Sequence, residues 1–272
     1  MISDLFEYEY LQRTIICGAI IGILCATVGV YVILRSMSFL GAGISHSALG
    51  GTAISVTIGS NILFTSFIFC MFVVWITGFL AEKAKLKIDS AIGILFAFSQ
   101  ALGIFIFSLT PVYRTDLNSY LFGNIISIGK PELVLCIIVT VIVLFFIFLF
   151  YRQLNSFIFD KEFAQVCGIN IRFLHYMLLT LIALTVVVSM QIVGILLVSA
   201  LIVIPPSAAS LIAKRMGNTL ILSAIFGAIS SVLGIGISYY LNAAPGPVIV
   251  LTSSIIFILC FISHRHKLRK NQ

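Results

Sequence analysis

The residue with the clearest potential for chemistry is His46, the only histidine that lies within an apolar stretch of the chain. It sits in a segment of small and polar residues, Gly41 to Gly51. An ionisable side chain within a membrane-spanning segment is costly and indicates function. Neutral imidazole is a ligand for zinc, manganese and iron, so this histidine is predicted to contact a transition-metal ion. The alternative is a buried histidine that is hydrogen-bonded to Ser45, Ser99 or a backbone carbonyl.

A second unusual segment is a polar island between two apolar runs. Phe159, Phe163 and Val166 recur at helical spacing, Asp160 stands near the start of the pattern, and Gly168 follows its end. The spacing predicts one short amphipathic helix that lies flat under a membrane domain. Such a helix is typical of a docking surface for a partner protein.

Composition places both segments in a membrane protein. The chain has 272 residues, of which 61% are hydrophobic and 9% are charged, and its mean hydropathy is +1.20. A soluble domain carries about 25% charged residues. No phosphate-binding P-loop, HExxH motif, nucleophile elbow or pair of carboxylates on one helical face is present, so we expect no enzyme.

Apolar runs of about 20 residues predict transmembrane helices, since each span must satisfy its own backbone hydrogen bonds in lipid. We therefore expect an all-α, polytopic helical bundle with eight or nine spans. The number is eight if residues 176–213 form one long, broken helix. The expected spans are 12–34, 40–59, 62–81, 90–109, 131–151, 176–192, 194–213, 218–241 and 246–262.

The basic residues fall in short clusters at the ends of apolar runs. Placing these clusters on the cytoplasmic side puts the N-terminus outside and the C-terminus inside, in agreement with the positive-inside rule. The formal net charge of +7 therefore reflects topology, not nucleic-acid binding. We expect a single membrane domain over 1–272, with a cytoplasmic region at 152–175 and a basic tail at 263–272.

Taken together, motifs along nearly the whole chain resemble the membrane permeases of bacterial ABC-type metal importers, the ABC-3 family of zinc, manganese and iron permeases. The matching segments are Arg35–Gly41 leading to Ile44–His46, Asp89–Ile94, Tyr120–Gly123, Val193–Val198 with Ile204–Pro206 and Ala208, and Pro245–Pro247. Asp160, Glu162, Ala164 and Gly168 resemble the motif that couples these permeases to their ATPases. One departure is Ala42, where family members commonly carry an acidic residue one helical turn before the histidine.

The resemblance implies a type II-like ABC importer fold and a homodimer in the bacterial inner membrane. It also implies two cytoplasmic ATPases, which hydrolyse the ATP, and an extracytoplasmic metal-binding protein. The expected function is import of a divalent transition metal, with zinc favoured over manganese or iron and no permanently bound cofactor. The alternatives are an importer of a chelated metal or cofactor, a stand-alone secondary transporter, and a membrane scaffold or receptor.

Overall fold

The computed structural model describes residues 9–109 and 128–270, and for residues 266–270 it describes the backbone alone. Regular structure in these ranges is helical throughout, so the predicted all-α bundle is confirmed. The segment from Tyr120 to Gly123, which contributed to the family resemblance, lies outside the described residues.

The described part of the chain forms long helices joined by short connections. Eight of these helices are long and apolar enough to cross a membrane. They are α2 (Glu9–Leu34), α4 (Ile62–Ala84), α5 (Ile88–Leu109), α7 (Lys130–Leu149), α10 (Ile171–Val193), α11 (Ile195–Ile212), α12 (Met216–Leu241) and α13 (Pro245–Lys270). A further long helix, α3 (Leu40–Ile58), carries the small and polar segment, and two short helices are α8 (Tyr151–Phe159) and α9 (Lys161–Val166).

The region 176–213 is two helices. Gly194 separates α10 from α11 and has a φ of 86°, a conformation that favours glycine. Its N–H donates to the carbonyl of Met190 at 2.9 Å and closes the last turn of α10. Asn170 caps the start of α10 by accepting from the N–H of Phe173 at 3.0 Å, so this helix begins before the expected residue 176.

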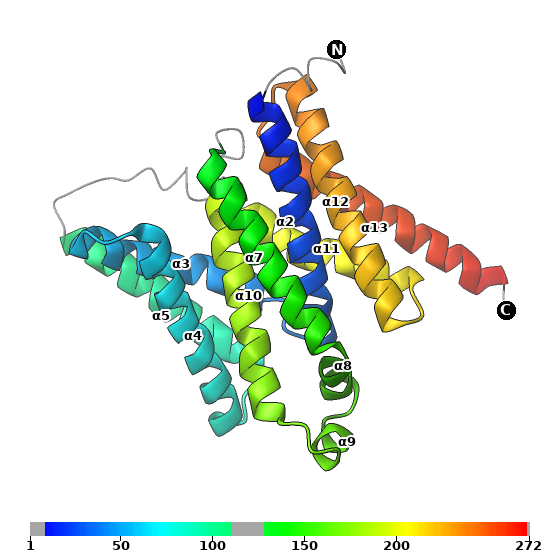
Figure 1. Ribbon diagram of the computed structural model, residues 1–272, viewed down its shortest axis with the longest axis horizontal. Helices are drawn as coiled ribbons and strands as arrows, with labels where there is room; N and C mark the ends of the chain where they lie inside the picture. Colours follow the sequence, from blue (N-terminus) through cyan, green and yellow to red (C-terminus); the bar gives the residue numbers. More distant parts are fainter. Residues whose placement is uncertain (1–8, 110–127, 271–272) are drawn as a thin grey trace.

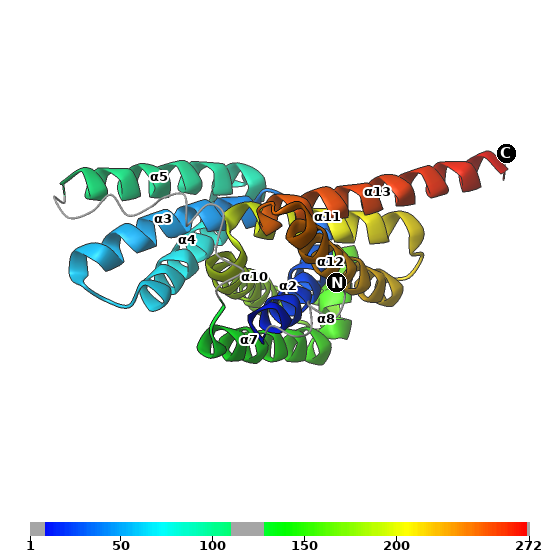
Figure 2. The same cartoon turned by 90° about the horizontal axis from the view of Figure 1, so that it is seen from above.

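The helices form two groups on either side of a central set. Figures 1 and 2 show α3, α4 and α5 on one side, α11, α12 and α13 on the other, and α2, α7 and α10 between them. The spans α2 and α10 are the most buried, with 72% of the apolar stretch of each buried, against 17% for α5. The outer helices therefore present apolar side chains to their surroundings, as lipid-facing helices do.

Close backbone contact joins α2 to α12. A Cβ atom at Gly227 would collide with the carbonyl of Gly22 and lie 2.7 Å from the Cβ of Ala26. The hydroxyl of Ser223 donates to the carbonyl of Ala26 at 2.7 Å across the same contact. Small residues that let helix backbones approach and a hydroxyl that bonds across the interface are the usual means of joining helices in lipid.

A second close approach joins α2 to α11. Pro206 lies inside α11 and has no N–H, so the carbonyl of Ile202 loses its helical donor. This carbonyl lies against Gly29 of α2, where any Cβ would overlap it. The helix α2 is thus held by backbone contact on two neighbours.

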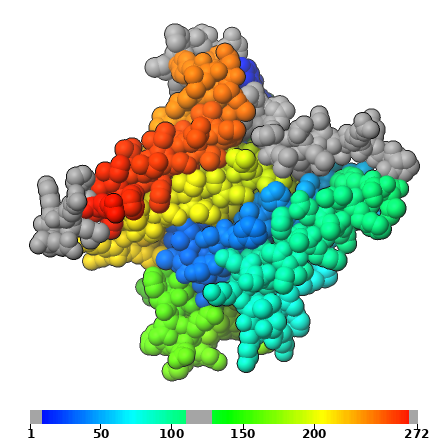
Figure 3. Space-filling view, turned by 180° about the vertical axis from the view of Figure 1, so that it is seen from behind, coloured from blue at the N-terminus to red at the C-terminus, as the bar shows by residue number. Residues whose placement is uncertain are grey.

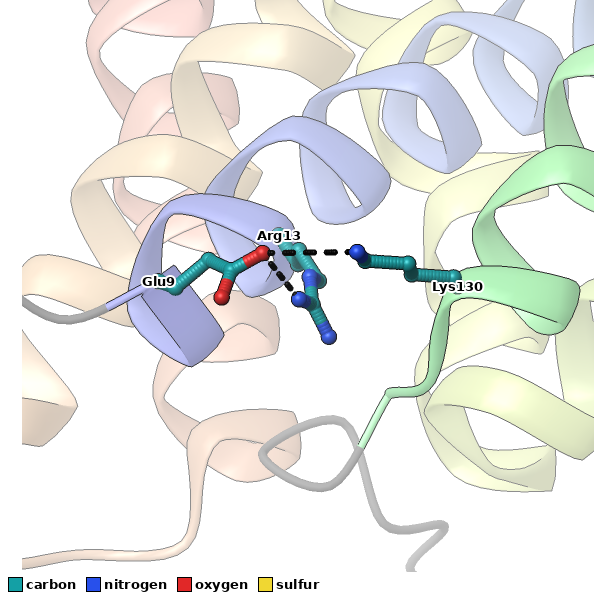
Figure 4. Close-up of polar contacts among 3 residues, drawn as sticks. All are labelled: Glu9, Arg13 and Lys130. Atoms are coloured by element: carbon teal, nitrogen blue, oxygen red, sulfur yellow. Dashed lines mark hydrogen bonds and ion pairs between the residues drawn. The ribbon is translucent and has the colours of Figure 1, made fainter.

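Charged residues gather at both ends of the bundle. At one end, the Glu9 carboxylate bonds the Arg13 guanidinium and lies 4.0 Å from the ammonium of Lys130, which links α2 to α7 (Figure 4). At the other end, Arg35 and Lys161 line one pocket with residues of α4, α8, α9 and α10. This gathering of basic residues at one end is what the positive-inside argument expects of a cytoplasmic end.

The contact between α2 and α12 makes a direct prediction for Gly227→Ala. The added methyl group has to push the two backbones apart, so we expect a loss of about 1–3 kcal/mol in stability. Thermal unfolding of the purified full-length chain in detergent measures the effect. The matched control is Gly236→Ala on the same helix, where a Cβ meets nothing within 4 Å and the melting temperature should stay or rise. Equal melting temperatures for the two variants would contradict this packing.

Candidate functional site

The polar island folds as two helices, α8 and α9, that project from the basic end of the bundle (Figure 1). The prediction of one helix through Phe159, Phe163 and Val166 is wrong, because the chain breaks at Asp160. This residue adopts an extended conformation, and its carboxylate accepts from the N–H of Phe163 at 2.9 Å. Asp160 therefore ends α8 and caps α9, as an aspartate at a helix N-cap does.

The end of α9 is equally well defined. Gly168 has a φ of 77°, and its N–H donates to the carbonyl of Gln165 at 3.1 Å. The next N–H, of Ile169, reaches back to the carbonyl of Ala164 at 3.0 Å. This pair of bonds is the Schellman arrangement, which needs a residue that tolerates a left-handed conformation. The predicted roles of Asp160 and Gly168 as start and end of the helix are confirmed.

The helix α9 has one face against the protein and one face exposed. Ala164 is fully buried, and Lys161 and Gln165 line the pocket beside α10. Phe163 and Val166 are 59% and 87% exposed. Two apolar side chains held outward on a capped helix form an apolar patch, which we name the α9 patch.

The neighbouring helix α8 holds this patch rigidly on the membrane bundle. Leu154 and Phe157 of α8 are fully buried. The aromatic ring of Phe157 packs against the ring of His175 on α10, with 6.3 Å between the ring centroids. The segment that carries the α9 patch is thus joined through α8 to α10, one of the three central helices.

His46 lies on α3 and packs against α5. Its ring makes an edge contact with Phe96, with 5.3 Å between the ring centroids. Its Nδ1 is shielded from solvent and has no hydrogen-bond partner in the described part of the chain. The hydroxyls of Ser45 and Ser99 are likewise buried without partners among the described residues, so the structure shows no hydrogen bond from His46 to either hydroxyl.

The small residues around His46 serve helix packing. A Cβ at Gly43 would overlap the side chain of Ile92 on α5. A Cβ at Gly50 would lie 2.9 Å from the carbonyl of Ser99. Figure 3 shows α3 (blue) lying between α11 (yellow) and α5 (green). Close packing on these neighbours fixes the place of the imidazole.

The structure thus brings the four predicted coupling residues together on one capped segment and leaves His46 on a separate helix. Among the described residues, no group of three histidine, cysteine, aspartate or glutamate side chains is placed to hold a metal ion. His46 therefore belongs to no such group of three among the described residues.

One arrangement was not predicted from the sequence, the pocket that Arg35, Phe157, Lys161 and His175 form with the ends of α4 and α5. The sequence places Arg35 in a segment of the family resemblance and Lys161 among the basic residues that indicate topology, and neither pattern predicts a pocket. Their association depends on contacts between residues far apart in the sequence, which no local pattern reveals.

A polytopic helical bundle of this kind, with a capped helix that projects from one end, is the architecture of a membrane transport subunit. Residues 7–264 match a family model that is described as "ABC 3 transport family". The chain belongs to this family, and the resemblance to the permeases of ABC-type metal importers is confirmed. It is the transport subunit and not the catalytic one.

Relatives and a solved structure cover nearly the full chain. The chain is 36% identical over 261 residues to the manganese transport system membrane protein MntC of Listeria monocytogenes, covering 96% of this chain and 93% of the relative. It is 32% identical over 267 residues to the chelated iron transport system membrane protein YfeD of Yersinia pestis, covering 98% and 90%. The structure of PsaBC from Streptococcus pneumoniae in complex with Fab matches with a TM-score of 0.84 at 35% identity, covering 96% and 94%.

The cap at Asp160 makes a second prediction. Replacement with alanine removes the acceptor for the N–H of Phe163 and should destabilise α9 by about 1 kcal/mol. Hydrogen–deuterium exchange of peptides covering 161–166 should become about fivefold faster, whereas Asp160→Asn, which keeps a capping oxygen, should exchange like the wild type. Unchanged exchange in Asp160→Ala would show that the cap does not hold this helix.

Proposed function

We propose that this chain is the permease of an ATP-driven importer for a divalent transition-metal ion, with manganese favoured. The observation that carries the proposal is an imidazole whose buried Nδ1 has no hydrogen-bond partner among the described residues, held by close helix packing in a membrane permease of this family. Neutral imidazole binds such ions, and a single side chain gives the weak, reversible contact that a pathway requires.

The choice of metal rests on the relatives. MntC is named for manganese and YfeD for chelated iron. The sequence-based preference for zinc gains no support from these names. Ala42 removes an acidic partner for His46, so the imidazole of a second copy of the chain is the proposed further ligand.

The α9 patch is the proposed contact with the ATPase. Asp160 and Gly168 set the ends of α9, Ala164 seats it on the bundle, and Glu162 stands exposed beside Phe163. ATP binding would draw two ATPases together and move the two copies of the chain between two states. Proposed partners are therefore two ATPase subunits, a second copy of this chain and an extracytoplasmic metal-binding protein.

The proposed location is the inner membrane of a bacterium, with the α9 end and the C-terminus in the cytoplasm. The basic residues at that end support this orientation. The regions 152–175 and 263–272 are then the cytoplasmic coupling region and tail of one permease domain. The cargo ion is a substrate, and no resident cofactor is proposed.

A second candidate is import of a chelated metal, which the similarity to YfeD favours. In that case the coordination sites of the ion are already occupied by the chelator, and His46 would contact the chelator or nothing at all.

Cellular metal content tests the proposal. A bacterium without its own high-affinity importers would express the chain with its ATPase and binding protein under chelation, and elemental analysis would measure manganese, zinc and iron. We expect manganese to rise with the wild type and to fall by about tenfold or more with His46→Ala, because the loss of a ligand weakens metal contact by at least this factor. The matched control is His264→Ala, which removes a histidine from the basic tail.

The outcomes separate the parts of the proposal. A rise in zinc alone would overturn the choice of manganese, and equal uptake by His46→Ala would overturn the role of the imidazole. Iron uptake that requires an added chelator would favour the second candidate. If no metal rises although the assembled complex is detected in the membrane, the proposal that this chain imports free divalent ions is wrong.

A further inference from the structure

A pocket of about 660 Å³ lies between the ends of α4 and α5 and the α8–α10 segment. Figure 3 shows the two lobes that enclose it, α8 with α9 in green and α4 in cyan, side by side at one end. Arg35, Lys161, Arg172 and His175 all line the pocket, and Glu82 is the one carboxylate among the lining residues. The pocket is therefore rich in positive charge.

Two of these cations have no carboxylate partner in the described part of the chain. The Glu82 carboxylate is bonded to Arg172 at 3.2 Å. The Arg35 guanidinium lies 4.2 Å from the ring centroid of Phe157, and the Lys161 ammonium lies 5.9 Å from the same ring. Within the described ranges, neither Arg35 nor Lys161 takes part in an ion pair.

Two donor or acceptor atoms in the pocket also lack partners. The Nε of Arg35 and the Nδ1 of His175 are shielded from solvent and meet no hydrogen-bond partner among the described residues. A buried polar atom without a partner costs free energy, more so when its group is charged. A solvated basic surface, the simple alternative, would leave such atoms in water.

The electrostatics favour an anion at this place. Burial and the neighbouring Arg35 guanidinium lower the pKa of Lys161, since two cations share one partly enclosed space. Asn170 and Ile171 at the start of α10 also line the pocket, and the positive end of that helix dipole adds to the attraction.

We propose that this pocket binds a phosphate group, held between the Arg35 guanidinium and the Lys161 ammonium. Arginine and lysine are the usual ligands of phosphate, the former through paired hydrogen bonds. The source is either the headgroup of an anionic phospholipid or free inorganic phosphate. Leu86, Ile88 and Ile169 give the pocket an apolar margin at the ends of membrane-spanning helices, where basic pockets take lipid headgroups.

Such an anion would join elements that are otherwise connected only through side-chain packing. Arg35 follows the end of α2, and Lys161 begins α9. A phosphate bound to both would tie the central span to the helix that carries the α9 patch. The lining of the pocket includes neither His46 nor the exposed Phe163 and Val166 of the α9 patch.

The test uses native mass spectrometry of the purified full-length chain in detergent. Dioleoylphosphatidylglycerol and dioleoylphosphatidylcholine are titrated separately, and inorganic phosphate is titrated by calorimetry. The variants are Lys161→Gln and Arg35→Gln. The matched control is Lys214→Gln, which removes an exposed positive charge from the connection between α11 and α12. Elution as a single peak from a size-exclusion column confirms that each variant is folded. Because the side chain of Lys161 is exposed, Lys161→Gln is less prone to misfolding than Arg35→Gln.

We expect one phosphatidylglycerol to bind about tenfold more tightly than phosphatidylcholine, and both pocket variants to weaken it about tenfold while the control leaves it unchanged. If inorganic phosphate alone shows this pattern, the site stands and its source is free phosphate. Binding of neither probe, or equal weakening by the control, would overturn the proposal. Loss of ATPase capture by Lys161→Gln, with neither probe bound, would assign the pocket to a carboxylate of the partner protein and overturn it as well.

Discussion

The architecture depends on how closely α2 approaches its neighbours. Lipid provides little hydrophobic drive for one helix to bind another. Helices therefore associate through close packing of their backbones, which small residues allow. Gly22 meets Gly227 on α12, and Gly29 meets the carbonyl that Pro206 leaves free on α11. These contacts place α2 at the centre and thereby set where Arg35, at its far end, meets α8.

The working parts of the molecule lie where the regular helical pattern is interrupted. Gly194 divides one apolar region into two spans, and Asp160 and Gly168 mark off a short helix beyond the spans. Each interruption is closed by its own hydrogen bonds, so the interruptions are fixed in geometry. The segment that carries α9 is joined to the bundle through α8 and through the packing of Phe157 against His175, which is the route that the proposed coupling would use.

Local patterns in the sequence predicted most of the helices and the ends of α9. Apolar run length predicted the eight helices that can cross a membrane, because lipid allows few other solutions. The expected span at 40–59 forms α3, which is not among those eight, so the number is eight although 176–213 is two helices. The residue types at Asp160 and Gly168 marked the ends of α9 because caps are local. The sequence could not show that Phe159 belongs to a different helix from Phe163, since the same spacing fits one helix or two. It also could not show the pocket at Arg35, which needs contacts between distant segments. The surroundings of His46 also could not be predicted, and the structure shows that its buried Nδ1 has no hydrogen-bond partner among the described residues.

The central claim is that the α9 patch is where an ATPase takes hold of this permease. A photo-activated crosslinking residue placed at Val166, which is 87% exposed, tests it directly in membranes that contain the assembled complex. The matched position is Phe148 on α7, which is 84% exposed on an apolar span. The account predicts a crosslink to the ATPase from position 166 and none from position 148. A complex that assembles and gives no crosslink at 166, or gives equal crosslinks at both positions, would contradict it.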